Sequence, residues 1–149
     1  MLFKNLPSDT KEVLFCCGEI DCREGIGASV AKKKYENVLE AIKNTVFQYI
    51  SALREFGIEY NLNFFLLPVP PHASRGKKKG RFHQRQSRNH TIQMFNDELR
   101  RILRLLDFYD NLCGEDGHLL PKYNADGTHM NPSVLPLIEE ALNAFAPVK

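Results

Sequence analysis

The sequence lacks three features that would assign it at once to a class of protein. Its four cysteines, at positions 16, 17, 22 and 113, form no C-x-x-C pair, which excludes the usual zinc-binding patterns. The longest apolar runs, residues 13–17 and 64–69, are too short to cross a bilayer. The first nine residues contain no long apolar segment of the signal-peptide kind. We therefore expect free thiols, no metal or other cofactor, no membrane span and a cytoplasmic location.

Acidic residues are missing from residues 74–88, which contain seven lysines and arginines. Outside this stretch eighteen acidic residues face thirteen basic ones, although the whole chain has a net charge of +2. The sequence thus predicts a mildly acidic domain with one basic loop, and nucleic acid is not the expected partner. The loop is either a solvated, mobile segment or a site for phosphate groups of a nucleic acid or lipid surface. In the second case the anion-binding side chains would be Arg75, Lys77, Lys78, Lys79 and Arg81.

The order of apolar patterns predicts an α/β fold. The length of 149 residues and the hydrophobic content of 43% fit one domain over residues 1–149. Residues 13–17 and 62–69 are continuous apolar runs, typical of strands buried on both faces of a parallel sheet. Between them, apolar residues at helical spacing predict a crossover helix over residues 35–56, with Gly57 just past its end.

The second half of the chain repeats the alternation. We expect a helix over about residues 89–106, a short strand over residues 108–112, and a last helix with Asn131 as N-cap and Pro132 at its first position. Residues 19–28 are expected to form a polar loop. Alternating strands and helices with right-handed crossovers predict a three-layer domain around a parallel sheet.

Most chemically distinctive residues fall in the loops that follow the expected strands, where α/β proteins gather their chemistry. In one of these loops Asp126 precedes His129 by three residues, a spacing that lets the carboxylate orient the imidazole as a general base. The alternative is an Asp-Gly turn followed by a histidine that caps the last helix. Cys22, beside Arg23, is either a second candidate nucleophile or an inert buried thiol.

Two ordered blocks of the sequence resemble the SGNH (GDSL-type) hydrolases, a family of esterases and lipases with a flavodoxin-like α/β fold. Asp126-Gly127-Thr128-His129, before a C-terminal helix, resembles the last conserved block of that family. Gly18-Glu19-Ile20-Asp21 resembles its Gly-x-Asn-Asp block, and the longer form ending in Cys22-Arg23 is similar to a branch associated with carbohydrate metabolism. The resemblance implies an ester substrate, in this branch an acylated carbohydrate. It also implies that Asp126 and His129 are catalytic, that the Gly18 N–H helps to bind the oxyanion, and that Asp21 and Arg23 line the site.

The sequence departs from the family pattern in two respects. Ile20 replaces the asparagine that donates to the oxyanion, and no Gly-Asp-Ser block with a nucleophilic serine precedes Gly18. The chain therefore resembles the C-terminal part of the fold without the N-terminal strand, and we expect self-association or pairing with that missing segment. Two hypotheses follow. The domain is an SGNH-type serine esterase or deacylase whose serine is not present in this chain, or a non-catalytic SGNH-like module for binding or assembly.

Overall fold

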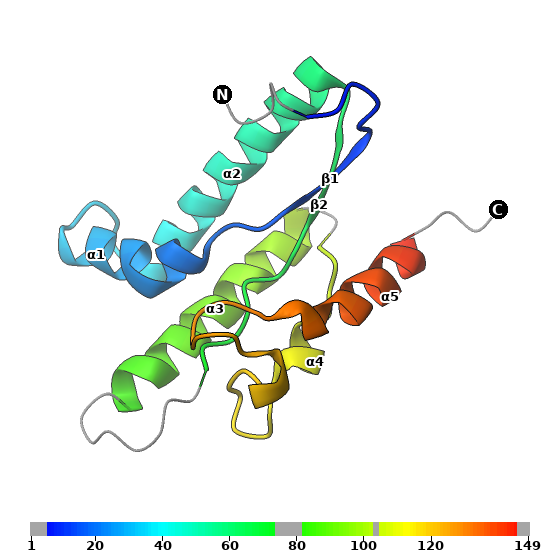
Figure 1. The fold of residues 1–149 in the computed structure, drawn as a ribbon. Helices are drawn as coiled ribbons and strands as arrows, with labels where there is room; N and C mark the ends of the chain where they lie inside the picture. Colours follow the sequence, from blue (N-terminus) through cyan, green and yellow to red (C-terminus); the bar gives the residue numbers. More distant parts are fainter. Residues whose placement is uncertain (1–5, 74–81, 103–104, 146–149) are drawn as a thin grey trace.

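The computed structural model describes residues 6–73, 82–102 and 105–145 (Figure 1). Strands β1 (Glu12–Phe15) and β2 (Asn63–Leu66) pair in parallel, with Glu12 opposite Asn63 and Phe15 opposite Leu66. The long helix α2 (Val38–Tyr60) connects them as a crossover. A parallel bridge between Leu66 and Leu105 continues the sheet on the other side of β2. The prediction of parallel strands joined by a helix is confirmed.

The remaining elements are helical. After β1 come the π-helix η2 (Asp21–Gly25) and α1 (Ile26–Ala31), and after β2 comes α3 (Phe82–Ile102). The chain then forms α4 (Tyr109–Leu112), the 3₁₀ turns η3 (Pro121–Tyr123) and η4 (Pro132–Val134), and α5 (Leu135–Phe145). Asn131 caps η4 by accepting a hydrogen bond from the Ser133 N–H at 2.9 Å, as the sequence predicted.

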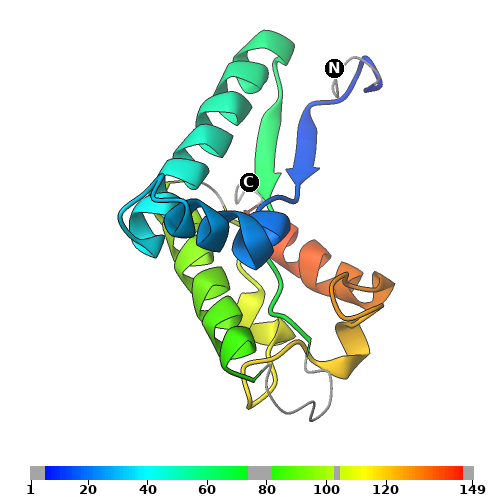
Figure 2. The same cartoon turned by 90° about the vertical axis from the view of Figure 1, so that its left-hand side faces the viewer.

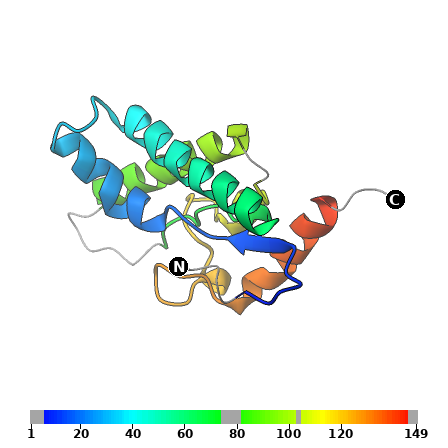
Figure 3. The same ribbon diagram turned by 90° about the horizontal axis from the view of Figure 1, so that it is seen from above.

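Helices cover both faces of the small sheet (Figures 2 and 3). On one face Leu66 joins a core built mainly from α2 and α3. On the other face Phe65 joins a second core with α4 and α5, and its ring centroid lies 6.3 Å from that of Phe145. Neighbouring residues of a strand point to opposite faces, so the continuous apolar run of β2 suits a strand between two cores. The expectation that residues 13–17 are buried on both faces is wrong, since no residue of β1 is buried and Leu14 is 43% exposed.

The long helix ends one turn later than the sequence predicted. Asn61, not Gly57, takes the left-handed conformation with φ 53°, and its N–H donates to the Gly57 carbonyl. Leu62 N–H also donates to that carbonyl, at 3.0 Å. A Cβ on Gly57 would lie only 3.0 Å from the Leu62 carbonyl oxygen. The glycine is therefore needed for the close return of the chain, while asparagine provides the cap.

Three further predictions were wrong. Residues 19–28 are helical, because Cys22 and Ile26 are buried four residues apart, a pattern hidden by the weak helix propensity of the neighbouring glycines. Residues 108–112 contain α4 where a strand was expected, because so short an apolar run does not distinguish the two. The expected loop over residues 74–88 includes the first turns of α3, since residues 82–88 are helical. Residues 74–81, with the five expected anion-binding side chains and the expected mobility, lie outside the described residues.

Candidate active site

The turn that holds Asp126 and His129 is built by its own backbone. A bridge between Asn124 and Met130 closes it, and the Ala125 N–H donates to the His129 carbonyl at 2.9 Å. Gly127 has φ +97°, a conformation that favours glycine, and its N–H donates to Asn124 Oδ1 at 2.6 Å. The Asp-Gly pair thus forms a turn, and Asn131, not His129, caps η4, the 3₁₀ turn that leads into α5.

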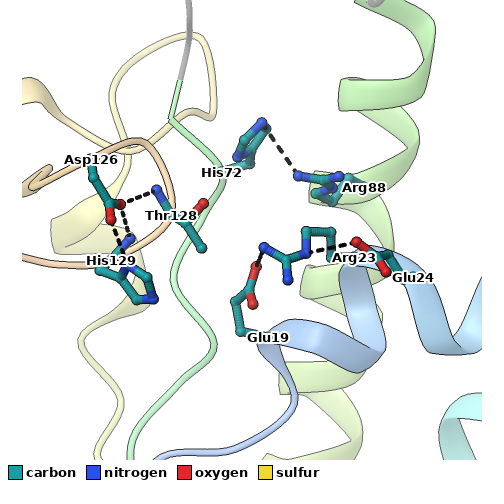
Figure 4. Close-up of polar contacts among 8 residues, drawn as sticks. All are labelled: Glu19, Arg23, Glu24, His72, Arg88, Asp126, Thr128 and His129. Atoms are coloured by element: carbon teal, nitrogen blue, oxygen red, sulfur yellow. Dashed lines mark hydrogen bonds and ion pairs between the residues drawn. The ribbon is translucent and has the colours of Figure 1, made fainter.

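The Asp126 carboxylate is bound from three directions within this turn. Its Oδ1 accepts hydrogen bonds from the backbone N–H groups of Thr128 and His129, each at 2.9 Å. Its Oδ2 lies 2.6 Å from Nδ1 of the His129 ring (Figure 4). The backbone hydrogen bond from His129, its ring and the Thr128 N–H together hold the pKa of Asp126 far below its usual range. The carboxylate is therefore ionised and accepts from Nδ1, and Nε2 is left as the basic nitrogen.

The imidazole is open to solvent. The His129 side chain is 74% exposed, and its Nε2 makes no hydrogen bond to any residue in the described ranges. A histidine whose Nδ1 is bound to a carboxylate and whose Nε2 is free has the arrangement of a general base. The pair can accept a proton from a nucleophile brought to its open side.

Gly18 follows β1 in a conformation that other residues rarely adopt. Its φ is +94°, and a Cβ there would lie 2.5 Å from Phe95 Cε1 and 3.1 Å from Val69 Cγ2. Its carbonyl accepts the Cys22 N–H at 2.9 Å and so starts the helical segment. Gly18 is buried, and within the described part of the chain its own N–H donates no hydrogen bond. The neighbouring Ile20 side chain is 65% exposed and has no donor.

Arg23 projects from η2 on the same face as Glu19, one helical turn apart. Its NH1 lies 3.6 Å from Glu19 Oε1 and its Nε lies 3.3 Å from Glu24 Oε1. The Nε atom is buried and its contact with Glu24 is an ion pair without hydrogen-bond geometry. Figure 4 shows this group in the same neighbourhood as the turn of Asp126 and His129 and as Arg88 of α3. The Arg23 guanidinium thus has unused hydrogen-bonding capacity at its Nε.

The side chain of Asp21 points toward helix α2. Its Oδ2 accepts a hydrogen bond of 2.7 Å from the Tyr49 hydroxyl on α2, and the side chain lines a cavity beside that helix. Of the predicted site-lining residues, Asp21 is thus engaged with α2, and its carboxylate faces the cavity on that side of η2.

The alternative nucleophiles within the described residues are poorly placed. Cys22 is 6% exposed in the core, and burial, followed by the charges of Asp21 and Glu19, raises the pKa of its thiol well above the ordinary value. A nucleophilic thiol needs the opposite shift. The serines with described side chains lie on an exposed turn (Ser8) or on helices (Ser29, Ser51 and Ser133), and none follows a strand.

Two asparagines that support the site were missed by the sequence analysis. Asn96, fully buried on α3, accepts the Val69 N–H and donates to the Val69 carbonyl, both at 2.9 Å. Seven residues earlier, Asn89 accepts the His72 N–H at 2.8 Å and donates to the Gly117 carbonyl at 3.0 Å. The available signal was two asparagines two turns apart on the apolar face of a helix. They fix the extended segment after β2, beside which the candidate site lies.

Neither a metal-binding cluster nor a membrane-spanning helix is found in the residues that the structure describes. Across residues 6–73, 82–102 and 105–145, histidine, cysteine, aspartate and glutamate form no group of three that could hold a metal ion. In the same ranges, no helix combines the length and apolar character that a bilayer span needs. The four cysteines are free.

Comparisons with known proteins give a fold and little else. No protein-family model matches the sequence, and no curated protein matches it. A solved structure from Streptococcus pneumoniae, provisionally described as a platelet activating factor, is 16% identical with a TM-score of 0.51; the match covers 91% of this chain and 59% of that chain. A GDSL-like lipase from Bacteroides thetaiotaomicron is 20% identical with a TM-score of 0.42, covering 69% of this chain and 51% of the lipase.

The chain thus spans little more than half the length of either solved structure. The likeness to the Streptococcus protein extends over nearly the whole chain and shows a shared fold, that of a partial mixed α/β domain with a parallel sheet.

Proposed function

We propose that these residues are the C-terminal part of a three-layer, flavodoxin-like SGNH hydrolase domain that cleaves acyl esters. The observation that carries the proposal is the Asp126–His129 pair, with Oδ2 and Nδ1 2.6 Å apart and the carboxylate fixed by two backbone N–H groups. A hydrogen-bonded turn holds this pair in a loop that comes after the strands along the chain, and α/β domains gather catalytic residues in loops that follow their strands. The substrate class is an ester, and the block Gly18–Arg23 extends the proposal to acylated carbohydrate.

The chemistry of the pair follows from its geometry. His129 Nε2 accepts the proton of a serine hydroxyl as the serine oxygen attacks the ester carbonyl, and the imidazolium formed is stabilised by Asp126. The Gly18 N–H donates to the oxyanion of the tetrahedral intermediate, and Arg23 supplies the donor that Ile20 lacks. His129 then returns the proton to the departing alcohol oxygen. In the second half of the reaction, water attacks the acyl-serine ester while His129 accepts its proton, and the carboxylic acid is released from the serine.

The serine in this proposal lies outside these 149 residues, on a strand that pairs with the free edge of β1. Within the described residues β1 pairs only with β2, and Leu14 is 43% exposed. An unpaired strand edge presents N–H and carbonyl groups to which another strand can add. A strand added at this edge would bring its following residue to the same end of the sheet as Gly18, within reach of His129.

A non-catalytic binding or assembly module is the second candidate, favoured by Ile20. Loss of one oxyanion donor costs on the order of 3 kcal/mol of transition-state stabilisation in enzymes that depend on it. In this alternative the Asp126–His129 turn is a structural feature alone, and the open edge of β1 serves assembly.

The deciding experiment compares ester hydrolysis by this chain and by the protein extended with the coding region upstream of Met1. We expect p-nitrophenyl acetate hydrolysis by the extended protein only, and a decrease in kcat/KM of about 10²–10⁴-fold for His129→Ala. His90→Ala, at an exposed position on α3, is the matched control and should keep full activity. An inactive extended protein, or one that His129→Ala leaves active, would overturn the hydrolase proposal in favour of the second candidate.

A further inference from the structure

A cavity of about 440 Å³ lies between η2, α1 and the first half of α2, on the side of η2 to which Asp21 points. Its volume is within the range of small-molecule sites. Its wall carries both polar and apolar surface, and its polar groups come from Asp21, Ser29, Lys34, Tyr35, Thr45 and Gln48. No residue of the 124–130 turn lines it, so it is separate from the proposed hydrolase site.

The wall presents two hydroxyl groups that already donate their hydrogen to a backbone carbonyl and can therefore only accept a hydrogen bond from a ligand. Ser29 Oγ donates to the Ile26 carbonyl at 2.7 Å, and Thr45 Oγ1 donates to the Ala41 carbonyl at 2.8 Å. Both hydroxyl oxygens therefore keep lone pairs for a ligand. A ligand that matches this wall must donate hydrogen bonds.

Asp21 is the strongest of these acceptors. The Tyr49 hydroxyl donates to Oδ2, whereas Oδ1 makes no hydrogen bond to a residue in the ranges described. Burial and this hydrogen bond raise the pKa of the Tyr49 phenol well above its ordinary value, so it stays a donor and keeps the carboxylate fixed. Gly25 leaves the approach to Oδ1 open, because a Cβ there would lie 3.2 Å from that oxygen.

Donors come from the opposite side of the cavity. In the turn after α1, Lys33 has φ 57° and the Lys34 N–H donates to the Ser29 carbonyl at 2.9 Å, as in a Schellman turn. This left-handed residue is normally glycine, so the turn places Lys34 at the cavity at some cost in backbone strain. The Lys34 ammonium lies 5.4 Å from the centroid of the Tyr35 ring.

We propose that this cavity binds a small, uncharged, hydroxyl-rich ligand of the size of one sugar ring. Hydroxyl groups both donate and accept, so they can bind Asp21 Oδ1 and the serine and threonine oxygens while they accept from Lys34 and Gln48. The carboxylate and the ammonium balance each other, which disfavours a ligand with net charge. The Tyr35 and Tyr49 rings provide apolar surface for the C–H face of the ring.

The test is an NMR titration of the ¹⁵N-labelled chain with glucose, galactose, mannose, N-acetylglucosamine and myo-inositol. At up to about 50 mM, a concentration that detects dissociation constants of order 10 mM, at least one probe should give saturable shifts at the amides of Asp21, Lys34 and Gln48. Glycine, a zwitterion that could pair with Asp21 and Lys34, is the competing ligand. No saturable shift with any hydroxylated probe, or equal shifts with glycine, would overturn the proposal.

Two matched pairs of variants locate the binding. Lys34→Ala should weaken it about tenfold, whereas Lys33→Ala, at the neighbouring residue that does not line the cavity, should not. Gly25→Ala should also weaken it, because the new methyl group lies beside Asp21 Oδ1, whereas Gly27→Ala has no neighbour within 4 Å. Equal effects within either pair, or shifts centred on the 124–130 turn, would assign the binding to another site. None of these readouts depends on ester hydrolysis, so failure of this proposal and failure of the proposed function are distinguishable.

Discussion

Asp126 holds His129 by two bonds at once: its Oδ1 accepts the histidine backbone N–H at 2.9 Å and its Oδ2 contacts the ring Nδ1 at 2.6 Å. Backbone and side chain of the histidine are thus fixed by a single carboxylate. The ring cannot turn without breaking a contact that an ionised acid strengthens. An orientation of this kind is what a general base requires before its nucleophile arrives.

The same contacts make stability depend on the ionisation of Asp126. Because the pKa of Asp126 is lowered in the folded chain, its contribution is present above the pKa of the unfolded chain, about 4, and is lost as the pH falls through the lower folded value. Asp126→Asn should therefore lower the free energy of unfolding at pH 7, and the difference from the parent chain should shrink below about pH 4. Urea unfolding at a series of pH values measures this, with the exposed Glu140→Gln as control. A difference that does not change with pH would contradict the assignment.

Asn96 should be among the most costly polar residues to remove. Asn96→Ala leaves the N–H and the carbonyl of Val69 buried without partners, which should lower the free energy of unfolding by about 2–5 kcal/mol. Gln93→Ala, at an exposed position one turn earlier on α3, should change it by less than about 0.5 kcal/mol. Chemical denaturation of the two variants gives the comparison. Similar stabilities would show that water replaces the lost contacts.

Gly18 should tolerate no side chain. Gly18→Ala combines an unfavourable φ of +94° with a methyl group 2.5 Å from Phe95 Cε1, and we expect a loss of about 2–4 kcal/mol in stability. Gly27→Ala is the control, since its methyl group meets nothing within 4 Å and alanine favours a helix, so a gain of about 0.5–1 kcal/mol is expected. Thermal unfolding ranks the two variants. A stable Gly18→Ala chain would mean that the turn after β1 is not as described.

The thiol of Cys22 should be unreactive in the folded chain. It is 6% exposed and its pKa is raised by burial, so alkylation by iodoacetamide at pH 8 should reach Cys22 only after unfolding in urea. Peptide mass spectrometry before and after urea distinguishes the cysteines. Rapid labelling of Cys22 in the folded chain would restore it as a candidate nucleophile.

The elements that the sequence predicts best are those whose residue pattern is local and unambiguous. The two strands, the crossover helix and the cap at Asn131 follow from unbroken apolar runs, a helical stripe and one capping residue. Residues 19–28 were missed because glycine weakens a helix signal that only burial of Cys22 and Ile26 restores. The strand expected at residues 108–112 is wrong because three apolar residues in five fit either a strand or a helical turn.

The contacts of the candidate site were predictable where they join residues close in the sequence, and were not predictable where they join residues far apart in it. The Asp126–His129 contact lies within one turn, so its spacing already contains the geometry. The direction of Asp21, by contrast, depends on Tyr49, twenty-eight residues away, and nothing in the spacing of the Gly18–Arg23 block reveals it. The roles of Asn89 and Asn96 likewise depend on where the segment after β2 runs across α3.

The central claim, that Asp126 and His129 activate a serine outside these 149 residues, is tested most directly by covalent labelling. The protein extended upstream of Met1 is treated with a fluorophosphonate, which reacts with serines that a neighbouring general base activates. Peptide mass spectrometry should find one adduct, on the serine of an upstream Gly-Asp-Ser block, that His129→Ala abolishes and His90→Ala preserves. An adduct within residues 1–149, an adduct that survives His129→Ala, or no adduct at all would contradict the account.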